Sequence, residues 1–401
     1  MVEQPAPDVK IGAQLISEGK MNSEMCEMVG CEFPLFAFSH CRDVIAAVSK
    51  AGGFGVLGVV GHTPESLAIE LDWIDEQVGD KPYGVDLIVP TAMADREGSL
   101  TPEDLHARVP DSHRRHVENI LAEHGIDTAG LWDSTRVPGG FGDNLREKGA
   151  SAQLEVALEH PIRAVVNALG APPPFMVEQA RAKGIAVGAL TGSREHAMKN
   201  VEAGVDFLVV SGTEAGGHCG EVSTMVVVPE VLETLRQHDM QVPVLAAGGI
   251  VTGRQMAAAM TMGAAGAWTG SVWLTTTEAE TLPSIKEKML SANSRQTVRS
   301  KSRTGKYTRQ LRSPWTDAWQ GEDAPEPLPM PLQGLVSGPP LNRIDKLAES
   351  GHAGAKSLAT YWVGQGVGLM NDPLSARAVV QNFMEDFASA YEHIRSVMGD
   401  A

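Results

Sequence analysis

The stretch Ser211-Gly-Thr-Glu-Ala-Gly-Gly-His-Cys-Gly220 directly follows a short apolar run, 207–210, that has the composition of a buried strand. Two more glycine turns follow apolar runs later in the chain, Ala246-Ala-Gly-Gly-Ile250 and Trp268-Thr-Gly-Ser271. Glycine lets backbone N–H groups approach a bound oxyanion, because no Cβ intervenes. Three such turns at successive strand ends predict one wall of a cofactor site. The last two fit the phosphate site that barrel enzymes often build after their seventh and eighth strands.

Around these turns the chain alternates between apolar runs and helical segments. The runs are apolar throughout instead of alternating, which is typical of a parallel sheet covered on both faces. Eight such runs favour a closed (β/α)8 TIM barrel over an open doubly wound sheet, whose dinucleotide fingerprint would follow the first strand. The predicted strands are 33–38, 54–57, 83–89, 164–169, 186–190, 207–210, 242–246 and 266–272.

Two segments do not fit this repeat. Residues 91–149, between the third and fourth predicted strands, carry a polar helical stretch and predict a helical insertion. Because the insertion follows the C-terminal end of a strand, it is well placed to act as a lid. Residues 291–401 predict a C-terminal helical extension, with a final helix at 373–398 that packs on the barrel. The predicted division is therefore a barrel over 1–290 and an extension over 291–401.

Composition limits the class of protein. The chain has 401 residues, 43% of them hydrophobic, and a formal net charge of −17. This charge argues against a nucleic-acid partner or an anionic membrane surface. The four cysteines lack paired metal-type spacing, and a disulfide framework is implausible in so long a chain. No apolar window approaches the length of a membrane span, so we expect a cytoplasmic protein.

Several segments share a pattern with one enzyme family: 46–58 (AAVSKAGGFGVLG), 81–87 (KPYGVDL), 212–220 (GTEAGGHCG), 246–270, 304–306 with the following arginines, and 364–369 (GQGVGL). On these segments the chain resembles the nitronate monooxygenase family, formerly called 2-nitropropane dioxygenases, whose members are FMN-dependent barrels. Relatives of that family include flavin-type enoyl reductases and an NADH:quinone reductase group. The resemblance covers most of the chain except the insertion.

The resemblance implies FMN as the cofactor, with its phosphate on the loops after the seventh and eighth strands. Asp86 stands where the family usually has Asn, and Ser211 and Trp268 stand where it usually has Gln. An ionised Asp86 near the flavin would disfavour an anionic reduced cofactor unless the carboxyl group were protonated or paired. The positions that the resemblance assigns to cofactor binding are Asp86, Ser211, Gly216, Gly217, Gly248, Gly249, Trp268, Thr269, Gly270 and Ser271.

Two residues are candidates for a catalytic role. His218 follows two glycines at a strand end, so its imidazole is expected beside the flavin and substrate as an acid or an anion stabiliser. Alternatively, it holds the glycine loop by hydrogen bonding. The best-known family members carry a histidine at the end of the fourth strand, whereas segment 166–170 reads Val-Asn-Ala-Leu-Gly here. Asn167 is a candidate for orienting a substrate carbonyl or nitro oxygen, or for capping the next helix.

The missing histidine bears on the substrate. A base is needed to deprotonate a neutral nitroalkane, whereas a preformed nitronate needs none. The resemblance therefore implies an FMN-dependent oxidoreductase that oxidises alkyl nitronates with O2. One alternative is an NAD(P)H-dependent reductase acting on a quinone, an enone or an enoyl-CoA-type substrate. In that case the basic run 295–312 would bind phosphates.

A third alternative is a flavin- or phosphosugar-binding barrel without turnover. In every case we expect a small-molecule partner, no metal, and no nucleic-acid or membrane partner. The number of subunits stays open, and an oligomer is possible.

Overall fold

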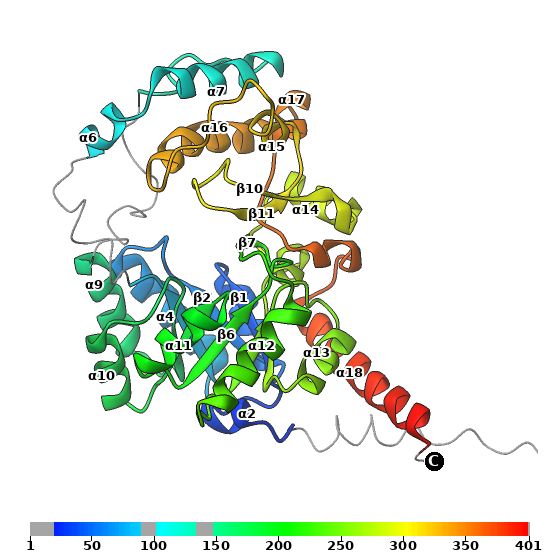
Figure 1. The fold of residues 1–401 in the computed structure, drawn as a ribbon. Coiled ribbons are helices and arrows are strands. Elements are labelled where there is room, and N and C mark those ends of the chain that lie inside the picture. The colour runs from blue at the N-terminus through cyan, green and yellow to red at the C-terminus, as the bar shows by residue number, and fades with distance from the viewer. Residues whose placement is uncertain (1–19, 90–101, 134–146, 400–401) are drawn as a thin grey trace, which may run out of the picture.

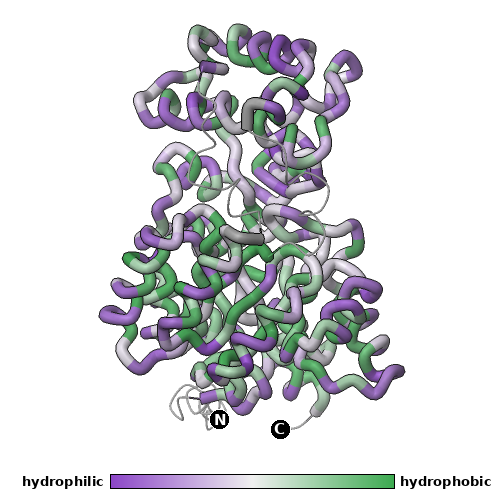
Figure 2. The backbone as a smooth tube through the Cα atoms, turned by 90° about the vertical axis from the view of Figure 1, so that its left-hand side faces the viewer, coloured by the Kyte–Doolittle hydropathy of each residue, from purple (hydrophilic) through white to green (hydrophobic). Residues whose placement is uncertain are grey.

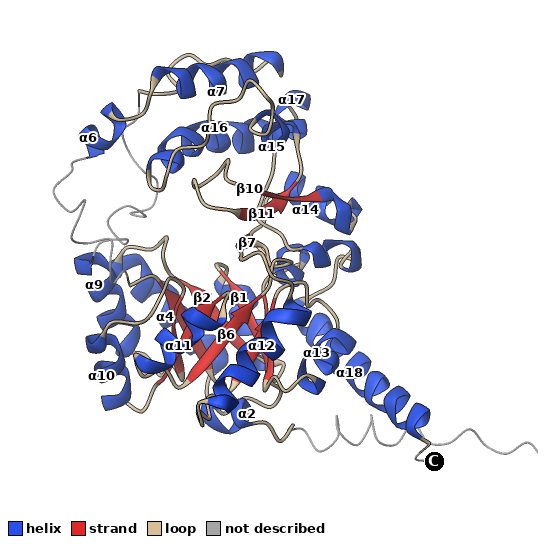
Figure 3. Ribbon diagram, viewed as in Figure 1, coloured by secondary structure: helices blue, strands red, loops and turns tan. Residues whose placement is uncertain are grey.

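A computed structural model describes residues 20–89, 102–133 and 147–399, and it confirms the predicted closed barrel (Figures 1 and 3). Parallel strands pair in the order β1-β2-β3-β4-β5-β6-β8-β9, and β9 closes the ring against β1. The strands are β1 (Leu35–Ser39), β2 (Phe54–Gly58), β3 (Tyr83–Leu87), β4 (Ala164–Asn167), β5 (Ala186–Thr191), β6 (Phe207–Ser211), β8 (Val244–Ala247) and β9 (Gly266–Thr269).

Each strand divides its side chains between the barrel interior and the surrounding helices. Phe36, Phe54 and Phe207 belong to an interior cluster, whereas intervening residues such as Leu57 and Leu208 pack in the outer core. This alternation follows from the two-residue period of a strand. The short helix α2 (Glu24–Val29) adds Met25, Cys26 and Val29 to the interior cluster. These side chains fill the N-terminal end of the barrel.

Helices surround the barrel, as the alternating sequence predicts. Hydrophobic segments run through the centre of this body, and hydrophilic stretches lie toward its outside (Figure 2). The helix after β2 shows how the sequence sets a boundary: Thr63 accepts a hydrogen bond from the N–H of Ser66, and Pro64 is the first helical residue. The helices are α3 (Arg42–Lys50), α4 (Pro64–Val78), α9 (Glu147–Leu158), α10 (Pro174–Ala182), α11 (Arg194–Glu202), α12 (Thr224–Gln237) and α13 (Gly253–Thr261).

A second body, which we call the upper lobe, consists of the described residues 102–133 and 297–358. It stands over the C-terminal ends of the barrel strands (Figure 1). Its elements are α6 (Pro102–Ala107), α7 (Asp111–Glu123), β10 (Thr297–Ser300), β11 (Thr308–Leu311), α15 (Pro314–Ala318), α16 (Leu332–Glu349) and α17 (Ala353–Leu358). Between the lobe and the barrel lie α14 (Pro283–Ser291) and three 3-10 helices, η2 (Ser271–Thr275), η3 (Ser294–Gln296) and η4 (Gln365–Leu369).

The upper lobe combines the predicted insertion with most of the predicted C-terminal extension. Arg343 on α16 donates hydrogen bonds to the carbonyls of Asp127 and Ala129, at 2.7 and 3.1 Å. His352 donates to the carbonyl of Gly125 at 3.2 Å. The two segments therefore form one body instead of two separate additions. Residues 90–101 and 134–146 of the insertion lie outside the described residues, and the role of the insertion as a lid stays a prediction.

Only the last helix of the extension lies along the barrel flank. Helix α18 (Ala376–Met398) packs against α13 and α3 (Figure 1). Gly253, the first residue of α13, permits this contact: a Cβ there would overlap the carbonyl oxygen of Phe383 and the backbone nitrogen of Phe387. None of the helices in the described part of the chain has the length and apolar character needed to cross a bilayer.

Substituting Gly253 tests this helix contact. We expect Gly253→Ala to lower the melting temperature, because overpacking a close contact costs roughly 1–3 kcal/mol. The matched control is Gly334→Ala on α16, where a Cβ meets nothing within 4 Å. The control should melt at the same or a higher temperature, since Ala is the better helix former by about 1 kcal/mol. Circular dichroism measures both, and equal melting of Gly253→Ala and the parent would contradict the close packing of α13 on α18.

Candidate active site

The carboxyl ends of parallel strands meet at one rim, and the glycine loops lie on the β6, β8 and β9 side of it. The loop after β6 and the turn after β8 both contact the first residue of α12. A Cβ on Gly248 would lie 2.7 Å from the Thr224 hydroxyl, and a Cβ on Gly212 would overlap the Thr224 backbone. Glu214 accepts hydrogen bonds from the N–H and hydroxyl of Thr224, both at 2.9 Å. The two loops are thus held on one helix end.

A segment returning from the upper lobe packs on the same loops. Gly216 lies so close to Gly364 that a Cβ on Gly216 would sit 2.8 Å from the Gly364 nitrogen. The N–H of Gly364 donates to the Ser271 hydroxyl at 2.8 Å, and the N–H of Gln365 donates to the Glu214 carbonyl at 2.8 Å. The predicted cofactor residues Gly216 and Ser271 therefore also join the barrel to the segment that includes η4.

The turns after β8 and β9 present backbone N–H groups that no other described residue uses. Neither Gly248 and Gly249 nor Gly270 and Ser271 donate a turn or loop hydrogen bond to such a residue. The two β8-turn glycines have φ of 104° and 73°, a conformation that favours glycine. Gly270 faces open space, since within 4 Å an added Cβ would meet Phe38 alone, at 3.9 Å. Together these turns form a cradle suited to a phosphate.

An aromatic wall lines the interior beside this cradle. Trp268 on β9 points inward and is 7% exposed, and its ring stacks on Phe38 and Phe36 at centroid distances of 6.1 and 6.3 Å. The adjacent Thr269 points outward instead, where its hydroxyl donates to the Phe36 carbonyl and accepts from the indole N–H of Trp273. The side chain of Thr269 is therefore structural, and its backbone alone remains for a cofactor.

Asp86 is a buried polar group in the interior whose side chain has no hydrogen-bond partner among the described residues. It lies on β3 opposite Gly58 of β2, at an inward-facing position, and is 6% exposed. Its Oδ2 has no hydrogen-bond partner among the described residues. Burial raises the pKa of Asp86 well above its usual value, because desolvation penalises the carboxylate. A protonated Asp86 carries one donor and one acceptor, as does the Asn that the resembling family usually has here.

The two remaining predicted residues of the β6 side lie at the rim. Ser211 ends β6 at an inward-facing register position, opposite Ala247. Gly217 and His218 form the short strand β7 (Gly217–His218), which pairs with β11 and so joins the barrel to the upper lobe. The His218 ring is exposed, and its Nε2 lies 3.0 Å from the Thr304 hydroxyl. Although the residue as a whole is exposed, partial desolvation of the ring and the nearby Lys306 ammonium lower its pKa, so a neutral imidazole is favoured.

Asn167 does not face the barrel mouth. It is fully buried at the end of β4, and its register partner Leu87 packs in the outer core. Its Oδ1 accepts from the N–H of Val89 at 2.9 Å, and its Nδ2 lies 3.1 Å from the Gly170 carbonyl. The amide is thus satisfied by backbone. Of the two roles expected for Asn167, this geometry favours positioning the loops after β3 and β4, and it leaves the substrate-orienting role without support.

A histidine that the sequence analysis missed lies at the rim next to Asp86. His40 directly follows β1, and its Nδ1 lies 2.8 Å from the carbonyl oxygen of Gly58. Its ring packs edge-on against Phe38 at 5.2 Å. The signal in the sequence is a histidine immediately after the first apolar strand. It could be interpreted only with knowledge that the glycine ending the next strand leaves room for an imidazole ring.

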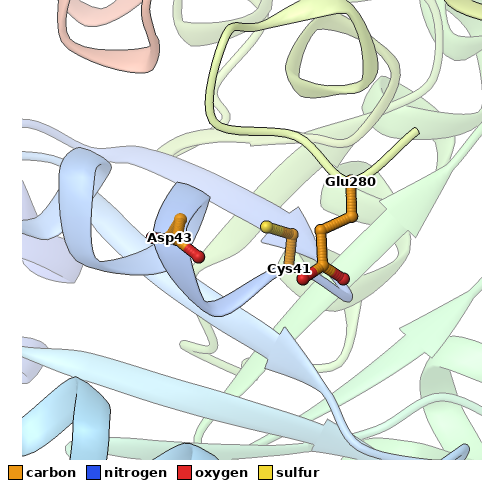
Figure 4. Close-up of side chains that lie close together, drawn as sticks. All are labelled: Cys41, Asp43 and Glu280. Atoms are coloured by element: carbon orange, nitrogen blue, oxygen red, sulfur yellow. The ribbon is translucent and has the colours of Figure 1, made fainter. Parts of the chain in front are cut away.

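Next to this histidine in the chain, Cys41 forms a cluster with Asp43 and Glu280 (Figure 4). One ligand atom from each lies within 4.8 Å of the others. The Cys41 thiol donates to the carbonyl of Glu278 at 3.1 Å, and burial raises its pKa. Metals bind the thiolate, so this environment disfavours a metal site, and we assign none to the cluster.

The basic run is mostly engaged within the protein. Arg303 and Arg309 are buried and donate to the carbonyls of Thr360 and Thr213, at 3.0 and 2.7 Å. Three others form ion pairs, which are Arg299 with Glu221, Lys301 with Glu326 and Arg312 with Asp317. Few cations of this run are therefore left to bind the phosphates of a dinucleotide.

A closed barrel with a glycine cradle, an aromatic wall and an unpartnered buried acid at one rim defines a cofactor-dependent barrel enzyme. The family model described as "Nitronate monooxygenase" matches residues 23–386. The chain therefore belongs to the nitronate monooxygenase family, and it is a flavin-type oxidoreductase.

Individual relatives agree with this membership. A Mycobacterium tuberculosis protein, Rv1533, named as a candidate monooxygenase, is 47% identical over 94% of this chain and 100% of its own length. A Staphylococcus saprophyticus protein named "Probable nitronate monooxygenase" is 26% identical over 91% of this chain and 98% of its own.

Solved structures share the fold. Nitroalkane oxidase from Streptomyces ansochromogenes superposes with a TM-score of 0.73 at 22% identity, covering 92% of this chain and 99% of that one. FabK from Thermotoga maritima gives a TM-score of 0.66 at 23% identity, covering 94% of this chain and 100% of that one. At these identities the likeness concerns the fold alone.

The protonation of Asp86 is testable through stability. A raised folded-state pKa means that the native protein holds a proton that the unfolded chain releases above its own pKa, so stability falls as pH rises through that interval. The Asp86→Asn variant has no carboxyl group at this position, so its stability should not fall in this way as pH rises. In urea unfolding of the cofactor-free protein, the stability of Asp86→Asn relative to the parent should increase from pH 5 to pH 8. The exposed control Asp323→Asn should give no such trend, and a flat difference for Asp86→Asn would mean that the carboxyl group is ionised when folded.

Proposed function

We propose that this chain binds FMN across the C-terminal mouth of the barrel and oxidises alkyl nitronates with O2. The proposal depends on the cradle of N–H groups after β8 and β9 and on the Asp86 oxygen at the same end, none of which has a hydrogen-bond partner among the residues that the structure describes. Such N–H groups suit a phosphate, and a buried donor-acceptor pair suits the polar edge of a ring system. When bound, FMN would accept electrons from the substrate and pass them to O2.

The residues of this chain would divide the binding between them. Gly248, Gly249, Gly270 and Ser271 would hold the phosphate through backbone N–H groups. Trp268 would provide a flat apolar surface near the ring, and Asp86 would offer it a neutral donor and acceptor. Ser211, Gly216 and Gly217 would border the cofactor on the β6 side. The upper lobe would limit the access of water.

His218 would act on the substrate side of the flavin. Its neutral imidazole carries one N–H, and the Lys306 ammonium lies near enough to lower its pKa. An anionic nitronate would be stabilised by that N–H and by the positive charge nearby. In the tautomer in which the Thr304 hydroxyl donates to Nε2, the ring proton lies on Nδ1, and that N–H would face the substrate. The exposed position at the junction between barrel and lobe fits a group that meets the substrate as it enters.

A reaction with donor substrates distinguishes the proposed function from the reductase alternative. The FMN-loaded protein is mixed without oxygen with ethyl nitronate, NADH or NADPH in turn, and flavin absorbance is followed. We expect ethyl nitronate to bleach the flavin rapidly and O2 to restore the colour with release of nitrite. Rapid bleaching by a nicotinamide with no response to nitronate would favour the reductase. A flavin that stays oxidised with every donor would favour a binding protein.

Filling the cradle tests the phosphate site. Gly270 has φ of −125°, which other residues adopt, and an added side chain enters open space. Gly270→Val should therefore fold, yet bind FMN at least about tenfold more weakly, a loss of roughly 1.4 kcal/mol. Titration of the cofactor-free protein by flavin fluorescence measures the affinity. Gly321→Val in the upper lobe is the control and should bind FMN as the parent does; equal binding by Gly270→Val would place the phosphate elsewhere.

A further inference from the structure

The ring of His40 lies inside the barrel mouth. Along β2, Phe54 and Val56 point into the interior, so the next residue of that face, Gly58, would direct a Cβ inward as well. That Cβ would lie 2.6 Å from Cε1 of His40 and 2.7 Å from its Nδ1. The imidazole therefore occupies the space over Gly58 that a side chain would otherwise take. Since Gly58 lies opposite Asp86 in the register, the ring is at the same corner of the mouth as the buried acid.

A single hydrogen bond sets the tautomer of His40. The Nδ1 atom lies 2.8 Å from the Gly58 carbonyl oxygen, which can only accept, so Nδ1 carries the proton. In the neutral ring Nε2 then holds a lone pair. No described residue makes a hydrogen bond to Nε2, and residue 40 as a whole keeps contact with solvent although neighbouring strand ends surround its ring. The geometry thus leaves an unprotonated nitrogen without a partner among the described residues, on a ring that lies at the barrel mouth.

The surroundings keep this ring neutral. Burial by the neighbouring strands and the nearby His62 lower the pKa of His40, outweighing the carbonyl bond that raises it. The titratable groups nearby are His62 after β2, Asp86 on β3, and the cluster of Cys41, Asp43 and Glu280 at the start of α3. Of these, His62 is the group whose charge affects the pKa of His40. Burial raises the pKa values of Asp86 and Cys41, so neither supplies a negative charge that would favour an imidazolium. At neutral pH the lone pair on Nε2 is therefore available.

We propose that His40 Nε2 is the base that removes the α-proton of a neutral nitroalkane, so that the enzyme accepts neutral carbon acids as well as preformed nitronates. This inference rests on the proposed function. The substrate C–H bond breaks, and its electron pair forms the C=N bond of the nitronate while the nitro oxygens take the negative charge. The proton moves to Nε2, and the imidazolium later returns it to water. No oxidant is consumed in this step.

The position explains how the family chemistry could persist without a histidine on β4. In this chain Asn167 at the end of β4 is turned outward and bonded to backbone, so it offers no base. His40 stands three strands away in the barrel order and has Phe38 against its ring, with Trp268 stacked on Phe38 in turn. An alkyl group would lie against this aromatic wall, with its α-carbon toward Nε2.

The test compares a neutral substrate with its anion. Asn in place of His40 retains a side-chain N–H that can reach the Gly58 carbonyl, but it has no basic nitrogen. With the FMN-loaded enzyme, His40→Asn should lower kcat/KM for nitroethane at least about 100-fold, as loss of a general base does. Turnover of ethyl nitronate and FMN content should stay within a few-fold of the parent. In the parent, 1,1-dideuterated nitroethane should react more slowly.

Two further measurements separate a base from a structural residue. The acid limb of the parent profile for nitroethane should lie below about pH 6.5, the ordinary histidine value, because the pKa of His40 is lowered. The control His62→Asn should turn over nitroethane at pH 8 as the parent does. Its acid limb should lie at a higher pH than that of the parent, because the charge that lowers the pKa of His40 is removed. Added imidazole should restore part of the nitroethane activity of His40→Ala, with rates that depend on the basicity of the imidazole used.

The outcomes are distinct. A parent enzyme that oxidises ethyl nitronate but not nitroethane overturns the assignment of His40 and leaves the proposed function standing. Full nitroethane turnover in His40→Asn overturns it as well. An enzyme inactive with both substrates removes the proposed function and, with it, this base.

Discussion

At the rim of this barrel, backbone segments pack against one another so closely that no side chain would fit between them. Gly212 and Gly248 rest on the first turn of α12, and Gly216 rests on the returning segment at Gly364. A Cβ at any of these points would displace a neighbouring loop, because packed interiors do not absorb such overlaps. The same absence of side chains leaves N–H groups of the β8 and β9 turns open. One constraint thus joins the barrel to the upper lobe and shapes the cradle.

The chemistry of the mouth follows from burial more than from charge. Although the chain carries a net charge of −17, burial favours the neutral forms of three titratable groups at the mouth. Burial raises the pKa of Asp86 and lowers the pKa values of His40 and His218. A neutral acid and two neutral imidazoles leave no ionised carboxylate among these groups to repel an anionic substrate. Neutral groups can also donate and accept protons without first losing a counter-ion.

Local sequence was sufficient for the barrel and the glycine turns, because strands, glycines and caps are encoded by neighbouring residues. The eight apolar runs became the barrel strands, and the Thr63-Pro64 pair began α4 as its chemistry predicts. Contacts between residues far apart in the sequence could not be predicted from neighbouring residues. The polar stretch of the predicted insertion divides at Pro110 into α6 and α7, and two prolines, Pro339 and Pro340, lie inside α16. Burial of Val336 and Ile344 on one face of α16 outweighs the low helix propensity of its prolines.

The candidate site likewise combines features that neighbouring residues determine with features that depend on contacts between distant residues. The resemblance to a known family was enough to propose Asp86 and the glycine turns as part of the site. The outward direction of Asn167, in contrast, depends on the register of β4 with β3. The importance of His40 depends on Gly58, a residue on the next strand whose missing side chain makes room for the ring.

The resulting site has two halves. Backbone donors and the aromatic Trp268 lie on the β6, β8 and β9 side, suited to hold a flat anionic cofactor. Asp86 on β3 and His40 just after β1 form the other half. Adjacent strands β9 and β1 join the halves through the stack of Trp268 on Phe38, so a ring lying along this wall would have phosphate donors at one end and His40 at the other. Under the proposed function, this arrangement would let one rigid barrel fix both the cofactor and the direction from which a proton leaves the substrate.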